Sequence, residues 1–353
     1  IQTAKFSRRD RYNLPINFTA EITLEPERMA VEQFCYSLTP GENAPVKAGV
    51  RRDDQSENSS YQMITEGLSL ETPLLFPYSF TKPIKSYGFP TELRATLMRY
   101  FEFLSELPLA FENLFQQTFY LAPLRDYPQR IYAWSGEQPQ DVGKRGEETV
   151  AALLASRQFI DQEQSVEEFV AQWLQALGLV HEFRLARIAE SRREFEVRVK
   201  ITPNSTEVPL TDVGFGVSQV LPVLTLCYYV PPGSTIILEQ PEIHLHPSVQ
   251  AGLADVFIHV IKTRNVQIIL ESHSEHLLRR LQRRIAEEKD GMKNTDAALY
   301  FCRMTDIGRS ELTPLDVDEF GNITNYPPNF FGDEMGDLVA MTEAAMRRQQ
   351  ANL

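Results

Sequence analysis

The fold of this chain is decided by the stretch Thr235-Ile-Ile-Leu-Glu-Gln-Pro-Glu-Ile-His-Leu-His-Pro247. It opens with a short, continuous apolar run, which is typical of a strand buried on both faces of a parallel sheet. The run ends in an acid, Glu239, which Gln240 and Glu242 follow. A carboxylate at the end of a dry strand is costly unless it binds a metal ion or a proton. Because ligands of open parallel sheets lie beyond the carboxyl ends of the strands, the stretch predicts a chemical site at that edge.

A second apolar strand, over residues 266–270, ends in the same way with Glu271, Ser272 and His273. The first strand has the Walker B pattern: an apolar run, an acid for a Mg²⁺-bound water, and a residue that positions the attacking water. The second has the pattern of a switch strand, whose histidine reaches the γ-phosphate of a nucleotide. Each piece alone has an ordinary explanation, since strands often end in Glu and most single histidines are structural. Their order and spacing together favour a nucleotide site.

A glycine-rich segment, Asp212-Val-Gly-Phe-Gly-Val-Ser-Gln219, opens the apolar helix predicted over residues 218–229. Its glycines let the backbone approach a phosphate closely, and the helix N-terminus with Ser218 supplies donors and a positive dipole end. A Gly-x-Gly by itself is equally compatible with a simple turn. The segment stands, however, where ABC-type ATPases carry the signature motif, which caps the ATP bound by the opposite subunit.

Strands and helices alternate in the second half of the chain, as expected of a βα sequence with a parallel sheet. These elements are predicted over residues 218–229, 234–238, 247–263, 266–270, 275–287 and 297–302. In the first half, residues 17–24 alternate with period two, which predicts a strand. Helices are predicted over 91–118 and 146–179, and an antiparallel hairpin over 182–188 and 194–201.

Composition is that of an ordinary globular protein, with 42% hydrophobic and 24% charged residues. The net charge of −13 disfavours a protein that coats nucleic acid over its whole surface. The longest apolar stretch, residues 220–230, is too short to cross a bilayer, and no leader-like segment opens the chain. Three dispersed cysteines in apolar settings indicate reduced thiols. We therefore expect a cytoplasmic protein without a membrane partner.

A local basic patch is compatible with the acidic total. Arg279, Arg280, Arg283 and Arg284 share one face of the helix predicted over 275–287, and are candidates for contacts with DNA phosphates. A solvated helix face is the commoner explanation of such a charge run.

Three blocks of sequence resemble the motifs of a prokaryotic group of ABC-type AAA ATPases, namely residues 212–224, 239–247 and 271–278. That group is related to the overcoming-lysogenization-defect (OLD) nucleases and, more distantly, to RecF and SMC proteins. One subgroup has Glu-Gln-Pro-Glu in its Walker B motif and a small C-terminal domain similar to residues 316–338. The segment Leu121-Ala-Pro-Leu-Arg125 also matches a strand upstream in that group. The resemblance covers residues 120–340 well and residues 1–110 only loosely.

The resemblance implies an α/β fold, the ABC-type P-loop NTPase head, with a mainly parallel sheet, an N-terminal antiparallel β portion and helical insertions. The implied divisions are a β-rich part of the first ATPase lobe, a helical insertion or arm, an ATPase core with signature, Walker B, D-loop and switch histidine, and a small C-terminal domain. They cover residues 1–90, 91–180, 181–310 and 311–353. No Gly-x-x-x-x-Gly-Lys-Ser/Thr phosphate loop occurs in the sequence. Because the chain starts at Ile1 without Met, we expect that Walker A loop in a segment upstream.

The resemblance also assigns roles to residues. Glu239 would be the carboxylate on the Mg²⁺ side, and Gln240 stands where most ABC ATPases have a catalytic glutamate. A glutamine orients a water but cannot accept its proton, so Glu242 or His273 would act instead, or turnover would be slow. The signature residues implied to contact ATP are Asp212, Gly214, Gly216, Ser218 and Gln219.

His244, His246 and Pro247 occupy the D-loop position, where the resemblance implies contact with the same loop of a second subunit. Two histidines two residues apart also make an incomplete zinc site, and the dimer contact is favoured. The expected function is a slow ATPase that uses ATP and Mg²⁺. It would form a head-to-tail homodimer or higher oligomer that switches a separate effector, such as a nuclease, in antiphage defence or DNA processing.

Two alternatives stay open. Gln240 favours an ATP-dependent scaffold with little or no turnover. An ATPase subunit of a membrane transporter is the third hypothesis, and both the long insertions and the Pro-Glu-Ile-His-Leu-His-Pro sequence argue against it.

Overall fold

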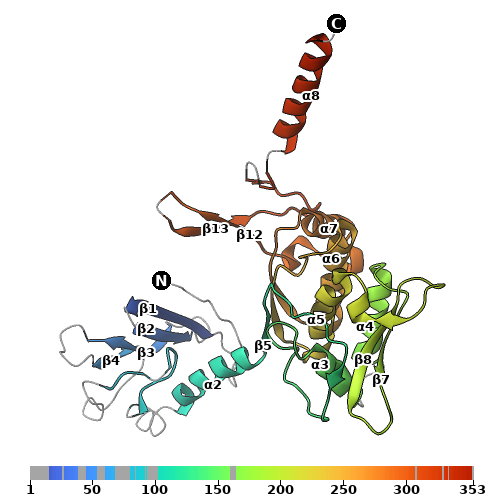
Figure 1. Ribbon diagram of the computed structural model, residues 1–353. Coiled ribbons are helices and arrows are strands. Elements are labelled where there is room, and N and C mark those ends of the chain that lie inside the picture. Colours follow the sequence, from blue (N-terminus) through green and yellow to red (C-terminus); the bar gives the residue numbers. More distant parts are fainter. Residues whose placement is uncertain are drawn as a thin grey trace. The chain divides into compact units, whose positions relative to one another are not determined.

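The computed structural model describes residues 16–25, 28–38, 45–53, 60–67, 80–83, 85–91, 93, 102–159, 164–306, 308–327, 330–332 and 334–351. Its backbone contacts divide the chain into two units, Ile1–Gln117 and Thr118–Leu353. In Figure 1 the first unit runs from blue to teal and the second from green to red. Each unit is described by itself.

The first unit contains a four-stranded antiparallel sheet. Its strands lie in the order β1 (Ile16–Glu25), β2 (Arg28–Leu38), β3 (Val46–Arg52) and β4 (Tyr61–Glu66). Along β2, the side chains of Phe34, Tyr36 and Leu38 are buried because alternate residues of a strand face the same side. They pack with Phe18 and Phe89 in one aromatic core. The sheet confirms the predicted N-terminal antiparallel portion.

Helix α2 (Glu102–Gln116) lies within the helical stretch predicted over residues 91–118. Residues 94–101 of that prediction lie outside the described part of the chain. Leu107 is buried in the aromatic core, and the ring of Phe111 lies 4.5 Å from that of Phe18 between centroids. The helix therefore belongs to the same hydrophobic core as the antiparallel sheet.

The second unit is built on a three-stranded parallel sheet. Its strands have the order β11 (Gln267–Glu271), β10 (Thr235–Glu239) and β5 (Thr118–Leu121). Ile236 and Leu238 on the central strand are fully buried, as expected for a strand covered on both faces. The parallel pairing of β10 with both neighbours confirms the predicted α/β core.

Three helices accompany this sheet (Figure 1): α5 (Phe215–Tyr229), α6 (Pro247–Arg264) and α7 (Glu275–Ala286). Helix α5 is apolar around its whole circumference and is buried from residue 217 onward, which makes it the central helix of the unit. Helix α6 packs against α5, and α7 packs along α6. None of the described helices is long and apolar enough to cross a lipid bilayer.

An antiparallel sheet and two further helices precede α5. The sheet contains β6 (Tyr132–Ala133), β7 (Glu182–Arg187), β8 (Glu194–Lys200) and β9 (Val208–Pro209). Strands β7 and β8 form the predicted hairpin. The helical block predicted over residues 146–179 is divided into α3 (Thr149–Ser156) and α4 (Val166–Ala176). Helix α4 starts at a capping box formed by Ser165 and Glu168.

The C-terminal part differs from one prediction. The strand expected over residues 297–302 is β12 (Leu299–Met304), but it pairs with β13 (Ser310–Leu315) in an antiparallel hairpin. The third strand of the parallel sheet is instead β5, far upstream in the sequence. Most β12 side chains are exposed, whereas a strand of a covered parallel sheet is buried on both faces. Two short 3₁₀ turns, Lys289–Gly291 and Asn294–Asp296, precede the hairpin, and α8 (Glu334–Ala351) ends the described chain.

Candidate functional site

The carboxyl ends of the three parallel strands bring acidic and polar side chains together. Glu239 of β10 lies in register with Glu271 of β11, and the backbone N–H of Gln240 donates to the carbonyl oxygen of Glu271 over 2.9 Å. Tyr120 of β5 forms a side-chain hydrogen bond with Glu239; burial, together with this bond, raises the pKa of Tyr120. The structure therefore brings the predicted residues Glu239 and Gln240 together with Tyr120 and Glu271 at one edge of the sheet.

The turn after β10 is conformationally unusual. Gln240 and His244 both adopt the left-handed backbone region, with φ of 44° and 63°. That region is uncommon for residues other than glycine and is concentrated at functional sites. Two backbone hydrogen bonds between residues three positions apart hold the turn in this shape. Ile243 N–H donates to Gln240 O, and Leu245 N–H donates to Glu242 O. Gln240 is thus held at the strand end by its own backbone.

Glu242 is buried, with 6% of its surface exposed. Its Oε1 accepts a hydrogen bond of 2.7 Å from the backbone N–H of His273. A carboxylate placed this way supports the loop after β11 and does not face solvent. The structure therefore gives Glu242 a different position from the one a proton acceptor for an attacking water would need.

The imidazole of His273 is open to solvent, with 78% of its side chain exposed. Its Nε2 lies 3.2 Å from Oε1 of Glu271, which orients the ring. Of the two predicted substitutes for a catalytic glutamate, His273 is therefore the one that a ligand at the sheet edge can reach.

Sequence reasoning missed Arg125, which lies four residues beyond β5. Its side chain is 6% exposed, and Nη2 donates weakly to the carbonyl oxygen of Glu239 over 3.5 Å. Burial lowers its pKa to about 10, although the nearby charges of Tyr120, Glu239 and Glu242 oppose this change. The only sequence signal for this residue was its position shortly after an apolar strand, in Leu121-Ala-Pro-Leu-Arg125.

The glycine-rich segment forms a 3₁₀ turn, Leu210–Asp212, followed by the N-terminus of α5 at Gly214. Among the described residues no side chain caps this helix, so the backbone donors of its first turn are open for a ligand. Gly214 is exposed and Gly216 half-buried, whereas Asp212 pairs with Arg130 at 2.8 Å.

Two predicted signature contacts face inward. Ser218 is buried and its hydroxyl donates to the carbonyl oxygen of Phe215 over 2.8 Å, while Gln219 is buried beside it. Their side chains are directed into the unit because the first buried turn of α5 begins at residue 217. The backbone around Gly214 and Gly216, not the Ser218 hydroxyl, is therefore the part of this motif that is presented outward.

The predicted D-loop residues lie at the surface. His244, His246 and Pro247 are all exposed. His246 caps α6, its Nδ1 accepting from the backbone N–H of Ser248 over 3.3 Å, and Pro247 starts the helix. Within the described residues, no group of three or more His, Cys, Asp or Glu side chains could hold a metal ion.

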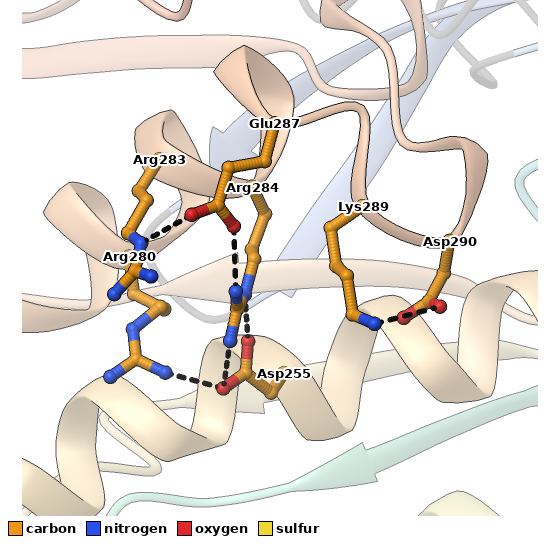
Figure 2. Close-up of polar contacts among 7 residues, drawn as sticks. All are labelled: Asp255, Arg280, Arg283, Arg284, Glu287, Lys289 and Asp290. Atoms are coloured by element: carbon orange, nitrogen blue, oxygen red, sulfur yellow. Dashed lines mark hydrogen bonds and ion pairs between the residues drawn. The ribbon is translucent and has the colours of Figure 1, made fainter.

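The arginines predicted as DNA contacts are tied into ion pairs (Figure 2). Arg280 and Arg284 reach from α7 to Asp255 on α6, at 2.5 Å and 2.6 Å. Arg283 pairs with Glu287, the residue directly after α7. Arg279 pairs with Glu275 at 3.1 Å. Arg280 and Arg284 therefore join helices α6 and α7. Contact of these arginines with DNA stays a prediction, and the neighbouring carboxylates make it less favourable.

The chain is similar to known protein families and to solved structures. Residues 95–279, more than half of the chain, match the family described as "AAA domain, putative AbiEii toxin, Type IV TA system". The chain belongs to this family of AAA domains. Residues 292–341 match a second family, described as a protein of unknown function, DUF3696. The comparison with curated proteins gives no match.

Several solved structures are also similar, at low identity. The SMC head domain from Thermotoga maritima is 11% identical, with 81% of this chain and 75% of that chain covered and a TM-score of 0.36. An Smc head with an extended coiled coil, bound to a ScpA domain and derived from Pyrococcus furiosus, is 11% identical, with 80% and 77% covered and a TM-score of 0.33. Likeness at this level carries no argument about function.

Proposed function

We propose that this chain is an ATP-binding and ATP-hydrolysing subunit of the ABC type, which acts as a nucleotide-gated dimeric switch for a separate effector in prokaryotic antiphage defence or DNA processing. One observation carries the proposal: Glu239 and Glu271 end two parallel strands in register, beside Gln240 and an exposed His273. Placing acids at the carboxyl edge of a parallel sheet is the arrangement in which such folds bind nucleotides and metal ions.

The strand-end carboxylates fit a magnesium ion. Mg²⁺ is usually held by one or two carboxylates together with substrate phosphates and waters, so a full cage of protein ligands is not required. Glu239 and Glu271 supply two carboxylates at one edge, and the Tyr120 hydroxyl orients that of Glu239. A bound Mg²⁺ would neutralise phosphate charge. The amide of Gln240 would orient the attacking water, and His273 would contact the γ-phosphate.

The phosphate-binding loop is expected on a further strand beside β11. Among the described strands, β11 pairs only with β10 and ends the parallel sheet. Its Ile269 is half-exposed, unlike the apolar residues of β10. Because an apolar edge strand of a parallel sheet is normally paired or covered, another strand at this edge is favoured.

The dimeric part of the proposal is supported by an exposed aromatic row beside the N-terminus of α5. The ring of Phe215 lies 5.4 Å from that of Tyr127 and 6.1 Å from that of His244. Tyr127 and Phe215 are 75% and 49% exposed. Exposed aromatic side chains next to open helix donors suit a surface that a second copy with its nucleotide covers.

Gln240 favours one alternative, an ATP-gated scaffold with little turnover. The two functions share nucleotide binding and differ in hydrolysis, because a glutamine cannot accept the proton of the attacking water. Phosphate release by the full-length protein discriminates between them. We expect slow release from wild type, loss in His273→Ala, and faster release in Gln240→Glu.

Background release from wild type together with ATP-dependent assembly would favour the scaffold. Failure of the full-length protein to bind ATP at all would overturn both functions. Arg184→Met is a suitable control, since this exposed arginine pairs with Glu207 at 2.6 Å on the antiparallel sheet, away from the strand ends.

A further inference from the structure

A cavity of about 380 Å³ lies in the second unit, at the opposite end of β10 from Glu239. Two prolines on its wall, Pro231 and Pro232, come shortly before β10 begins, and Arg264 is the last residue of α6. Because the two ends of a parallel strand lie at opposite edges of the sheet, this cavity is separate from the candidate nucleotide site. Its volume is that of a small-molecule binding site. The other lining residues are Gln138, Pro139, Gln140, Phe159, Tyr229 and Val230.

Hydrogen bonds and ring contacts hold the walls of this cavity in place. The Tyr229 hydroxyl donates to the carbonyl oxygen of Pro139 over 2.6 Å, which fastens one wall to the end of α5. The Gly233 N–H donates to the carbonyl oxygen of Arg264 over 3.2 Å, which joins two others. The rings of Phe159 and Tyr229 lie 5.7 Å apart between centroids. Because the walls are already assembled, a ligand would bind with little cost for ordering them.

Arg264 is the only charged residue among the described residues that line the cavity. A guanidinium has five N–H donors, yet its only hydrogen-bond partner in the described part of the chain is the carbonyl oxygen of Val230, which accepts from Nη2. Nε is buried without a partner among the same residues. Burial lowers the pKa of Arg264, and the groups that oppose this change are Cys227 and Tyr228, neither of them a carboxylate. A half-buried cation of this kind is stabilised by an anion that enters the cavity.

Two helix ends offset part of the Arg264 charge. Helix α5 ends at Tyr229 with Val230 as its cap, and α6 ends at Arg264 itself, so the carbonyl ends of both helices add partial negative charge here. The centroid of the Tyr228 ring, 5.9 Å from Cζ of Arg264, adds a cation–π attraction. These contacts stabilise the arginine in the protein alone. They also make a ligand with two negative charges less favourable at this place than a ligand with one.

We propose that this cavity binds a small carboxylate with an aromatic or other flat apolar body. The single negative charge of the carboxylate pairs with Arg264. The apolar body lies against Phe159, Tyr229 and the prolines of the wall. The exposed amides of Gln138 and Gln140 at the rim bind polar substituents of the ligand. The inference goes beyond the proposed function, because the site needs neither ATP nor a second copy of the chain.

Ligand-observed NMR of the full chain without nucleotide tests the site with three matched probes. Phenylacetate has one negative charge, phenylacetamide is its neutral isostere, and phenyl phosphate has mostly two charges above neutral pH. We expect phenylacetate to bind with a Kd of about 1 mM or tighter, as a ligand of this size can. Phenylacetamide should bind at least about tenfold more weakly, because it lacks the charge. Phenyl phosphate should also bind more weakly than phenylacetate, because the helix ends oppose its second charge.

Variants at the base and at the rim of the cavity test the charge pairing. Arg264→Met should raise the Kd for phenylacetate about tenfold or more, whereas Arg264→Lys keeps the charge and should stay within about fivefold of wild type. Gln140→Glu places a like charge at the exposed rim and should raise the Kd about threefold or more. The matched control Gln172→Glu adds the same charge at an exposed position of α4 that does not line the cavity, and should leave the Kd unchanged.

Absence of phenylacetate binding to wild type up to about 10 mM would overturn the proposal. So would equal binding of phenylacetate and phenylacetamide, or an unchanged Kd in Arg264→Met. Tighter binding of phenyl phosphate would contradict the assignment to a carboxylate. If Arg264→Met does not fold, the comparison of Gln140→Glu with Gln172→Glu decides, since both residues are exposed. A chain that binds phenylacetate but not ATP would defeat the proposed function and leave this inference standing.

Discussion

The Ser218 hydroxyl has a different partner in the structure from the one that the signature motif implies. The resemblance implies that this side chain contacts ATP, but in the structure it donates to Phe215 O and is buried. A serine of this kind stabilises the first turn of its helix. The donors left for a phosphate are then those of the backbone at Gly214–Gly216.

The first prediction concerns Ser218→Ala. Because only a buried local hydrogen bond is lost, we expect the free energy of unfolding to fall by about 1 kcal/mol. The affinity of the full-length protein for ATP should stay within about threefold of wild type, since the backbone donors remain. Denaturant unfolding and titration with a fluorescent ATP analogue measure the two quantities. A large loss of affinity with unchanged stability would restore the contact implied by the resemblance.

At the scale of elements, Asp255 explains how α7 is held against α6. Arg284 is mostly buried and donates to both oxygens of Asp255, and its pKa is raised by its hydrogen bonds to Asp255 and Glu287. Arg283, by contrast, is exposed and pairs with Glu287, the residue that caps the end of its own helix. These two neighbouring arginines therefore contribute differently to the stability of the contact between α6 and α7.

The second prediction compares these arginines. Arg284→Met should lower the free energy of unfolding by roughly 1–3 kcal/mol, because it leaves Asp255 with fewer partners in a half-buried place. Arg283→Met should change it by less than about 0.5 kcal/mol. Denaturant unfolding of both variants provides the comparison. DNA binding that weakens with salt and is lost in Arg279→Ala/Arg283→Ala would instead support the DNA contact.

A third prediction concerns the junction of α4, α5 and α6. Trp173 Nε1 donates to the Tyr228 oxygen over 2.5 Å, and the Tyr228 oxygen lies 2.8 Å from Nδ1 of His259. Because tryptophan only donates, the Tyr228 hydroxyl keeps its own proton, which it donates to Nδ1 in the tautomer that leaves this nitrogen unprotonated. Burial lowers the pKa of His259, against a smaller opposing effect of Asp290.

The sign of the pH dependence follows from that shift. The unfolded chain binds a proton at the ordinary histidine pKa, while the folded chain resists it, so His259 makes the protein less stable as pH falls below about 6.5. Unfolding between pH 7.5 and 5.5 should therefore show a loss of stability that is smaller in His259→Gln. Equal slopes for the two proteins would contradict this assignment.

At the scale of the whole molecule, the proposed switch depends on contact between two copies. The fourth prediction is that Phe215→Ala weakens ATP-dependent dimerisation of the full-length protein by about tenfold or more, since aromatic side chains at interface centres carry much of the binding energy. Its exposed position means that stability of the single chain should hardly change. Sedimentation with and without ATP measures the effect. Phe320→Ala, another exposed aromatic residue, should dimerise like wild type.

Much of the fold could be predicted from local patterns in the sequence. Apolar runs predicted β10 and β11, helical periods predicted α6 and α7, and period-two alternation predicted β1. These predictions succeed because side-chain burial repeats with the geometry of each element. The strand-end positions of Glu239 and Glu271 followed for the same reason, since both acids end apolar runs.

The sequence by itself therefore determined the elements, the parallel core and the edge at which the site lies. Only the tertiary structure decided that β5 and not β12 completes the sheet, that Ser218 faces inward, that Arg280 and Arg284 pair with Asp255, and that Glu242 accepts from the His273 N–H. The physical reason is that periodicity reports whether a side chain is buried, whereas its partner is set by chain crossings between residues far apart in sequence. Ion pairs and hydrogen bonds depend on that partner, and so does the bond from the His273 N–H to Glu242.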